Sequence, residues 1–99
     1  MKTEKFAILA RFEAKPGKEK EVLAFLKLAL PLAKEEVGTI KWYAIQLSPS
    51  TFGIFDTFET NEDRQTHLEG KIAVSLMANA SELLAKDPSI ELVDLIAIK

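Results

Sequence analysis

The stretch of sequence that most constrains the fold is Lys5–Lys18, which reads KFAILARFEAKPGK. Phe, Ile, Ala and Phe occupy every second position from 6 to 12, which is the period of a β-strand. The Pro-Gly pair at positions 16 and 17 breaks the strand, because both residues favour turns. Beyond it, apolar residues follow helical spacing and lysines recur every seven positions on one solvated stripe. We therefore predict a strand over Lys5–Ala14 and a helix over Lys18–Glu36.

The rest of the chain continues this alternation of strands and helices. A short Ser-Pro-Ser-Thr turn joins two strands into an antiparallel hairpin. Thr60, three residues before Asp63, resembles a helix cap, and Gly70 interrupts the helical region that follows. The order β-α-β-β-α-β is typical of a ferredoxin-like α+β fold, a four-stranded antiparallel sheet with its helices on one face. The further predicted strands are Thr39–Leu47, Phe52–Glu59 and Ile90–Ile98, the helical segments are Asn61–Glu69 and Lys71–Leu84, and one domain spans residues 1–99.

Composition places the chain among ordinary globular proteins and argues against several classes of partner. Of the 99 residues, 47% are hydrophobic and 28% are charged, with 13 Lys and Arg against 15 Asp and Glu. The two signs are interspersed, so no basic stripe is available for nucleic acid. We expect neither a membrane span nor a signal peptide, and we expect a cytoplasmic location. The sequence has no Cys, which excludes disulfides, thiolate metal sites and a Cys nucleophile.

Both faces of the predicted sheet are apolar. In the last strand, Ile90 and Leu92 share one face, whereas Val93 and Leu95 share the other. Helices on one side leave the second face uncovered, and a solvated face would be polar at every second position. We therefore expect a homodimer in which the two sheets pack together. The alternative is a small core with long side chains folded over its edge.

Two polar residues are candidates for chemistry. His67 is the only histidine, and an ordinary pKa of about 6.5 suits a general base or a donor to a substrate oxygen. The alternative for His67 is a solvent-exposed position on a helix. Asp56 interrupts an apolar strand, where a buried carboxylate must be paired or protonated. It is either a catalytic carboxylate or the ion-pair partner of Arg11, for which Asp94 is a second acidic partner.

Aromatic residues are the candidates for a binding pocket. Trp42 and Tyr43 are adjacent in a strand, so their side chains point to opposite faces, one towards a pocket and the other towards the dimer contact. Plain core packing is the alternative for each. No glycine-rich phosphate loop, nucleophile elbow or metal-ligand spacing is present, so we expect no nucleotide, flavin, haem or metal cofactor.

Several of these segments together resemble the antibiotic biosynthesis monooxygenase superfamily. The resemblance lies in ARFEAKPGKE at Ala10–Glu19, the apolar helix after it, the strand after Gly38, the strand Phe52–Glu59 and the pair His67-Leu68. It implies a ferredoxin-like dimer with packed sheets and a pocket between sheet and helices. Some members oxidise small aromatic substrates, often phenols, with O2 and without metal, flavin or haem.

The resemblance also implies roles for individual residues. His67 would be the base or donor and Asp56 its polar neighbour. The substrate would lie against the walls formed by Trp42, Phe58, Tyr43 and Arg11. The family often has Trp where this chain has Phe58, so Phe58→Trp should be tolerated. The haem-degrading branch is excluded, because Ala10 replaces its Asn and the chain has no second His.

A cofactor-free oxygenase is therefore our leading hypothesis. Two other functions fit the same fold: a non-redox enzyme that isomerises or degrades a small carbonyl metabolite, and a non-catalytic dimeric ligand-binding module. His67→Ala should lower turnover sharply but leave folding almost unchanged, because the short helix contributes little to the core.

Overall fold

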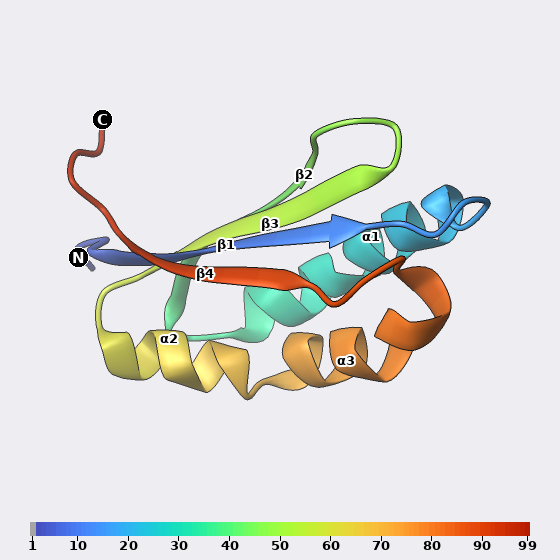
Figure 1. Cartoon of the computed structure of the whole chain (residues 1–99). Coiled ribbons are helices and arrows are strands. Elements are labelled where there is room, and N and C mark those ends of the chain that lie inside the picture. Colours follow the sequence, from blue (N-terminus) through green and yellow to red (C-terminus); the bar gives the residue numbers. More distant parts are fainter. Residues whose placement is uncertain (1) are drawn as a thin grey trace.

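The sheet contains four antiparallel strands in the order β2-β3-β1-β4, with all three helices on one face (Figure 1). The structure is a computed structural model, and it describes residues 2–99. It confirms the ferredoxin-like architecture and the division of the second helical region at Gly70. The strands are β1 (Phe6–Glu13), β2 (Thr39–Gln46), β3 (Thr51–Phe58) and β4 (Ser89–Asp94), and the helices are α1 (Glu19–Glu35), α2 (Asn61–Leu68) and α3 (Lys71–Leu83).

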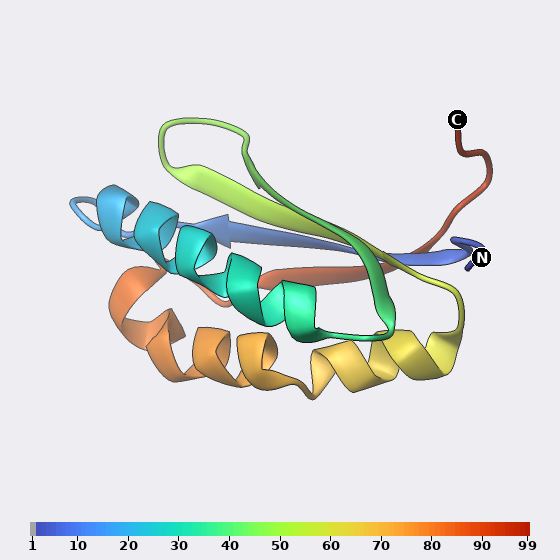
Figure 2. The same cartoon turned by 180° about the vertical axis from the view of Figure 1, so that it is seen from behind.

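The core lies between the sheet and α1. Phe12 and Phe52 are paired across β1 and β3, and both side chains are buried on the face that the helices cover. Val22 and Leu26 of α1 pack against them, as the helical spacing predicts. α3 lies alongside α1 beneath the sheet, as seen from behind in Figure 2. None of the helices within residues 2–99 is long and apolar enough to cross a membrane.

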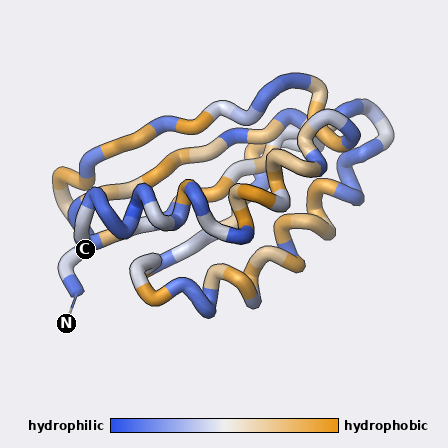
Figure 3. Tube along the Cα trace, turned by 90° about the horizontal axis from the view of Figure 1, so that it is seen from below, coloured by the Kyte–Doolittle hydropathy of each residue, from blue (hydrophilic) through white to orange (hydrophobic). Residues whose placement is uncertain are grey.

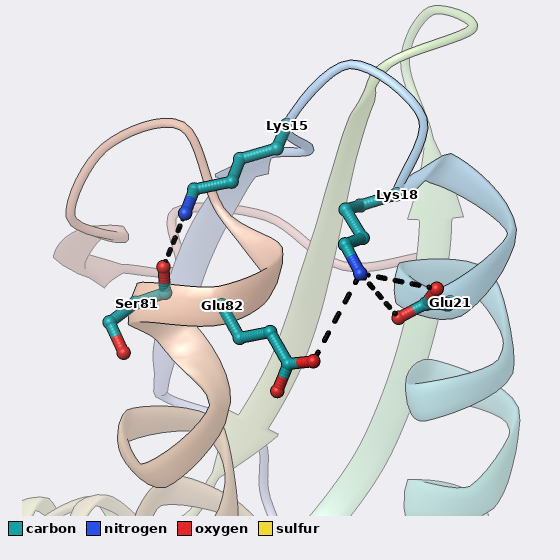
Figure 4. A network of polar contacts seen from close by, with 5 residues as sticks. All are labelled: Lys15, Lys18, Glu21, Ser81 and Glu82. Carbon is teal, nitrogen blue, oxygen red and sulfur yellow. Dashed lines mark hydrogen bonds and ion pairs between the residues drawn. The ribbon is translucent and has the colours of Figure 1, made fainter.

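The turn between β1 and α1 is tied to the end of α3 by polar contacts (Figure 4). Lys15 Nζ donates a hydrogen bond of 2.6 Å to the backbone oxygen of Ser81. Lys18 Nζ lies 3.5 Å from Glu21 and 4.0 Å from Glu82, and all these side chains are at least one-third exposed. Exposed ion pairs contribute little stability, so this network serves to orient the turn, which lies at the opposite end of the molecule from α2 (Figure 1).

The last strand is shorter than predicted. β4 ends at Asp94, not at Ile98, and residues 95–99 turn away from the sheet (Figure 1). Asp94 is paired with Phe6, the first residue of β1, so the chain beyond it has no neighbouring strand to bond. A single hydrogen bond, from the Leu95 amide to the oxygen of Lys5, extends the pairing. Ile96 is consequently fully exposed.

The face of the sheet away from the helices is uncovered in the single chain. Val93 is paired with Ala7 across β1 and β4 and lies on this face, as the sequence predicts. Tyr43 of β2 lies there too and is 50% exposed. The second apolar face inferred from the sequence is therefore present, and its occupant is considered below.

Candidate functional site

His67 lies in the last turn of α2 and is buried. The Thr60 side chain caps the helix by accepting a 3.1 Å hydrogen bond from the amide of Asp63, as the sequence indicates. The last turn then directs His67 towards the sheet, where it is only 9% exposed. Its ring packs against Phe58, with the ring centroids 5.4 Å apart. The alternative of a solvent-exposed histidine is therefore excluded.

Asp56 is the carboxylate behind His67. It lies within β3, fully buried, on the helix-covered face and paired across the sheet with Ile8 and Trp42. Its Oδ2 lies 2.7 Å from Nε2 of His67, close enough for an ion pair although not aligned as a hydrogen bond. Neither Asp56 Oδ1 nor the buried Nε1 of Trp42 has a hydrogen-bond partner among the described residues. Unpartnered polar atoms are rare in a folded core, so this part of the sheet is a candidate for function.

Glu36 completes the group from the opposite side of the ring. It follows the last residue of α1, and its Oε1 lies 2.6 Å from Nδ1 of His67. The Thr39 hydroxyl donates a 2.7 Å hydrogen bond to the same oxygen. The sequence analysis missed Glu36, because an acid at the end of a charged helix looks like ordinary solvated surface. Asp56, His67 and Glu36 thus form a line, carboxylate–imidazole–carboxylate.

Two glycines allow this close approach. A Cβ atom on Gly38 would lie 2.7 Å from Oδ1 of Asp63, so only glycine lets the turn before β2 pack against α2. A Cβ atom on Gly70 would lie 3.3 Å from Oε2 of Glu36. Glycine at these positions therefore brings Glu36 and His67, 31 residues apart, into contact.

The arrangement changes the proton affinity of both central groups. Burial raises the pKa of the Asp56 carboxyl, and the neighbouring His67 offsets this only in part. Burial by itself would lower the pKa of His67, but Asp56 and Glu36 outweigh it and raise the pKa above the ordinary value. The ring therefore stays protonated to a higher pH than an ordinary histidine, which corrects the ordinary titration expected from the sequence.

An open cleft of about 470 Å³ lies beside this group, within the usual size range of small-molecule sites. The end of α1, the turn into β2, α2 and the start of α3 enclose it, and Leu32 and Val37 provide apolar walls. His67 and Glu36 both line the cleft, but Asp56 does not, because it lies behind the ring. Among residues 2–99 no cluster of three or more His, Cys, Asp or Glu side chains is arranged to hold a metal ion.

Comparison with solved structures places the chain among known folds. It is 52% identical to NE2512, a protein of unknown function from Nitrosomonas europaea, over 97% of this chain and 93% of that one, with a TM-score of 0.95. It therefore belongs to the same family as that protein. A structure described as an antibiotic biosynthesis monooxygenase is 15% identical over 93% of this chain and 99% of that one, with a TM-score of 0.79. The chain has the antibiotic biosynthesis monooxygenase fold.

Rv0793 from Mycobacterium tuberculosis has a similar structure, with 16% identity, coverage of 95% of this chain and 97% of that one, and a TM-score of 0.83. No protein-family model and no curated protein matches the sequence. The fold named from the sequence is thus confirmed by structure, and the roles of individual residues depend on the geometry of the site.

Within the antibiotic biosynthesis monooxygenase fold, the candidate residues divide between the two faces of the sheet. His67, Asp56 and Phe58 are in contact or adjacent, and Trp42 lies next to Asp56 on the neighbouring strand. Tyr43 and Arg11 lie on the opposite face. The cleft of about 470 Å³ is lined by none of the four predicted binding residues, Trp42, Phe58, Tyr43 and Arg11. The suggested ion pairs of Arg11 are therefore wrong: Arg11 is paired with Gly53 and Ser89, while Asp56 and Asp94 are paired with Ile8 and Phe6 on the other face.

α2 is held on the sheet by polar side chains, since its two buried residues are Arg64 and His67. Figure 3 shows the helix as hydrophilic along almost its whole length. Arg64 Nη1 donates to the backbone oxygens of Ala7 and Val93, at 3.3 and 3.1 Å, and the guanidinium lies 5.1 Å from the ring centre of Phe6. The sequence analysis missed Arg64; its only signal is the three-residue spacing to His67, which puts both on one side of the helix.

Proposed function

We propose that this protein is a cofactor-independent monooxygenase that oxidises a small aromatic substrate, such as a phenol or an anthrone, with O2. The observation that carries the proposal is the buried group of Asp56, His67 and Glu36 opening on a cleft of about 470 Å³. The antibiotic biosynthesis monooxygenase fold supports it, since a protein of that description shares the architecture.

In this reaction the protein needs only to bind the substrate and to accept its proton. Loss of a proton from an electron-rich phenol or anthrone gives an anion that itself reduces O2. In an anthrone, a CH2 carbon becomes a carbonyl with one atom of O2, and the other oxygen atom leaves as water. The acid–base group with His67 at its centre takes up the substrate's proton, and the apolar walls Leu32 and Val37 displace water from part of the anion's surface.

Oxygen uptake tests this proposal. A panel of hydroquinones and anthrones is incubated with the protein in an oxygen electrode, and the rate is compared with oxidation in buffer alone. We expect His67→Gln, which keeps a polar side chain in place, to lower turnover by about 10²–10⁴-fold. Gln65→Ala, on the exposed side of the same helix, serves as the matched control. Oxygen uptake no faster than in buffer across the panel would refute the proposal.

We further propose that the protein is a cytoplasmic homodimer, joined through the face of the sheet that the helices leave uncovered. Val93 and Tyr43 lie on this face, and Tyr43 is half exposed in the single chain. A second copy would bury the same face by two-fold symmetry. The acid–base group lies on the other side of the sheet, so dimerisation leaves the cleft open.

A further inference from the structure

Neither ring nitrogen of His67 is free to meet a substrate. Nδ1 lies 2.6 Å from Glu36 and Nε2 lies 2.7 Å from Asp56, so both are directed at carboxylates. A histidine removes a proton from a substrate with a lone pair on one of these nitrogens. A ligand in the cleft would have to displace one carboxylate before His67 could act on it directly.

Glu36 is the more exposed of the two members of the group that line the cleft, since the side chain of His67 is only 9% exposed. The hydrogen bonds of its side chain within residues 2–99, to His67 and Thr39, both involve Oε1. Oε2 lies instead at the break between α2 and α3, beside Gly70, and both residues line the cleft. The side chain of Glu36 is 20% exposed, against 1% for Asp56. A ligand in the cleft therefore meets Glu36 before it meets the other two groups.

On the basis of the proposed function, we propose that Glu36 is the catalytic residue that contacts the substrate, with its Oε2 accepting the O–H proton of a phenolic ligand in the cleft. The O–H bond breaks and the proton passes to Oε2. His67 stays protonated between the two carboxylates: its Nδ1–H keeps the hydrogen bond to Oε1, and the ring keeps its ion pair with Asp56. The three groups together gain one proton, and the phenol becomes the phenolate that reacts with O2.

The surroundings of Glu36 suit this class of ligand. Leu32 and Val37 offer apolar contact to an aromatic ring. Lys2 and Lys71 also line the cleft, where their positive charge counters the carboxylates of Glu35 and Asp63. The Lys2 ammonium donates a hydrogen bond to the backbone oxygen of Val37.

A binding experiment without O2 tests the assignment independently of turnover. Two probes are titrated anaerobically at pH 7: 2-naphthol, which has the O–H group, and 2-methoxynaphthalene, which lacks it. A hydrogen bond to a charged carboxylate should make the unmodified protein prefer 2-naphthol by about tenfold or more. Glu36→Gln should reduce the preference to less than about threefold. Glu62→Gln removes the same charge from an exposed residue of α2 that does not line the cleft, and should keep the preference.

The outcomes separate this inference from the proposed function. A preference that survives Glu36→Gln, falls equally with Glu62→Gln, or is absent because neither probe binds would overturn the role of Glu36. A preference that depends on Glu36 without oxygen uptake on any substrate would support the contact and refute the oxygenase. Should Glu36→Gln fail to fold, Glu36→Asp keeps the charge but draws the carboxylate back from the cleft, and should reduce the preference at least threefold.

Discussion

Replacing His67 by Ala should destabilise the protein, contrary to the expectation from sequence that folding would hardly change. The substitution removes a ring that is 9% exposed, packs against Phe58 and separates two carboxylates. Breaking a buried ion pair by deleting one partner costs about 3–5 kcal/mol, because the other charge stays buried. In the variant, Asp56 can bind a proton and so avoid part of the cost of a buried charge. We therefore expect the free energy of unfolding to fall by about 3 kcal/mol at pH 6.

Urea denaturation at equal protein concentrations measures this loss, since an oligomer's stability depends on concentration. For a domain of this size, each kcal/mol corresponds to about 4–8 °C in Tm, so thermal unfolding gives a second reading. Gln65→Ala, an exposed change on the same helix, should stay within about 0.5 kcal/mol of the unmodified protein. A loss below about 1 kcal/mol for His67→Ala would refute the reasoning, because it would mean that Asp56 does not depend on the ring.

The free energy of unfolding should change with pH in a direction set by the raised pKa of His67. The pKa of His67 is raised in the folded protein, so its contribution is complete below about pH 6.5 and is lost as pH rises through the folded pKa. The free energy of unfolding of the unmodified protein should therefore fall in that window, and that of His67→Ala should not. Asp56 acts in the same direction at lower pH, because burial raises its pKa and disfavours its ionised form. An equal fall in both proteins would assign the effect to other groups.

Two further substitutions test the surroundings of the site. Val93→Lys places a charge on the uncovered face of the sheet, so light scattering should show a change from about twice 11.0 kDa to 11.0 kDa, and an unmodified protein already at 11.0 kDa would refute the dimer. Phe58→Trp, which the family resemblance predicts to be tolerated, should cost about 1–3 kcal/mol in urea denaturation, because Phe58 is fully buried against His67; unchanged stability would mean that the core has room beside the ring.

Local sequence patterns were sufficient to predict the fold and two members of the acid–base group, Asp56 and His67. Strand and helix periodicities depend on neighbouring residues, and a polar residue in an apolar strand is visible wherever it falls, so Asp56 and His67 could be identified. The pairing of Asp56 with Arg11 was wrong because it depends on which residues face each other, and β1 pairs Arg11 with Gly53. The extent of β4 was wrong for a related reason, since it is set by where β1 begins.

Glu36 could not be found from the sequence, because its role depends on a contact with a residue 31 positions away. Nothing in its local pattern distinguishes it from Glu35, and the two differ only once the chain turns at Gly38. From the sequence, Gly38 is expected only to end the helical segment, and α1 does end before it. Gly38 also leaves room for Asp63 of α2 beside the turn before β2. This contact joins residues far apart in the sequence, so it is visible only in the structure.

The way α2 is attached explains why the acid–base group can be so well positioned in so small a protein. An apolar helix face tolerates small shifts, because dispersion contacts have little directionality. α2 instead has Arg64 and His67 as its buried side chains, and their partners, two backbone oxygens and two carboxylates, fix both distance and direction. The same contacts that dock the helix therefore align His67 between Asp56 and Glu36. Stability and acid–base geometry depend on the same side chains, so a substitution that frees the ring should also loosen the helix.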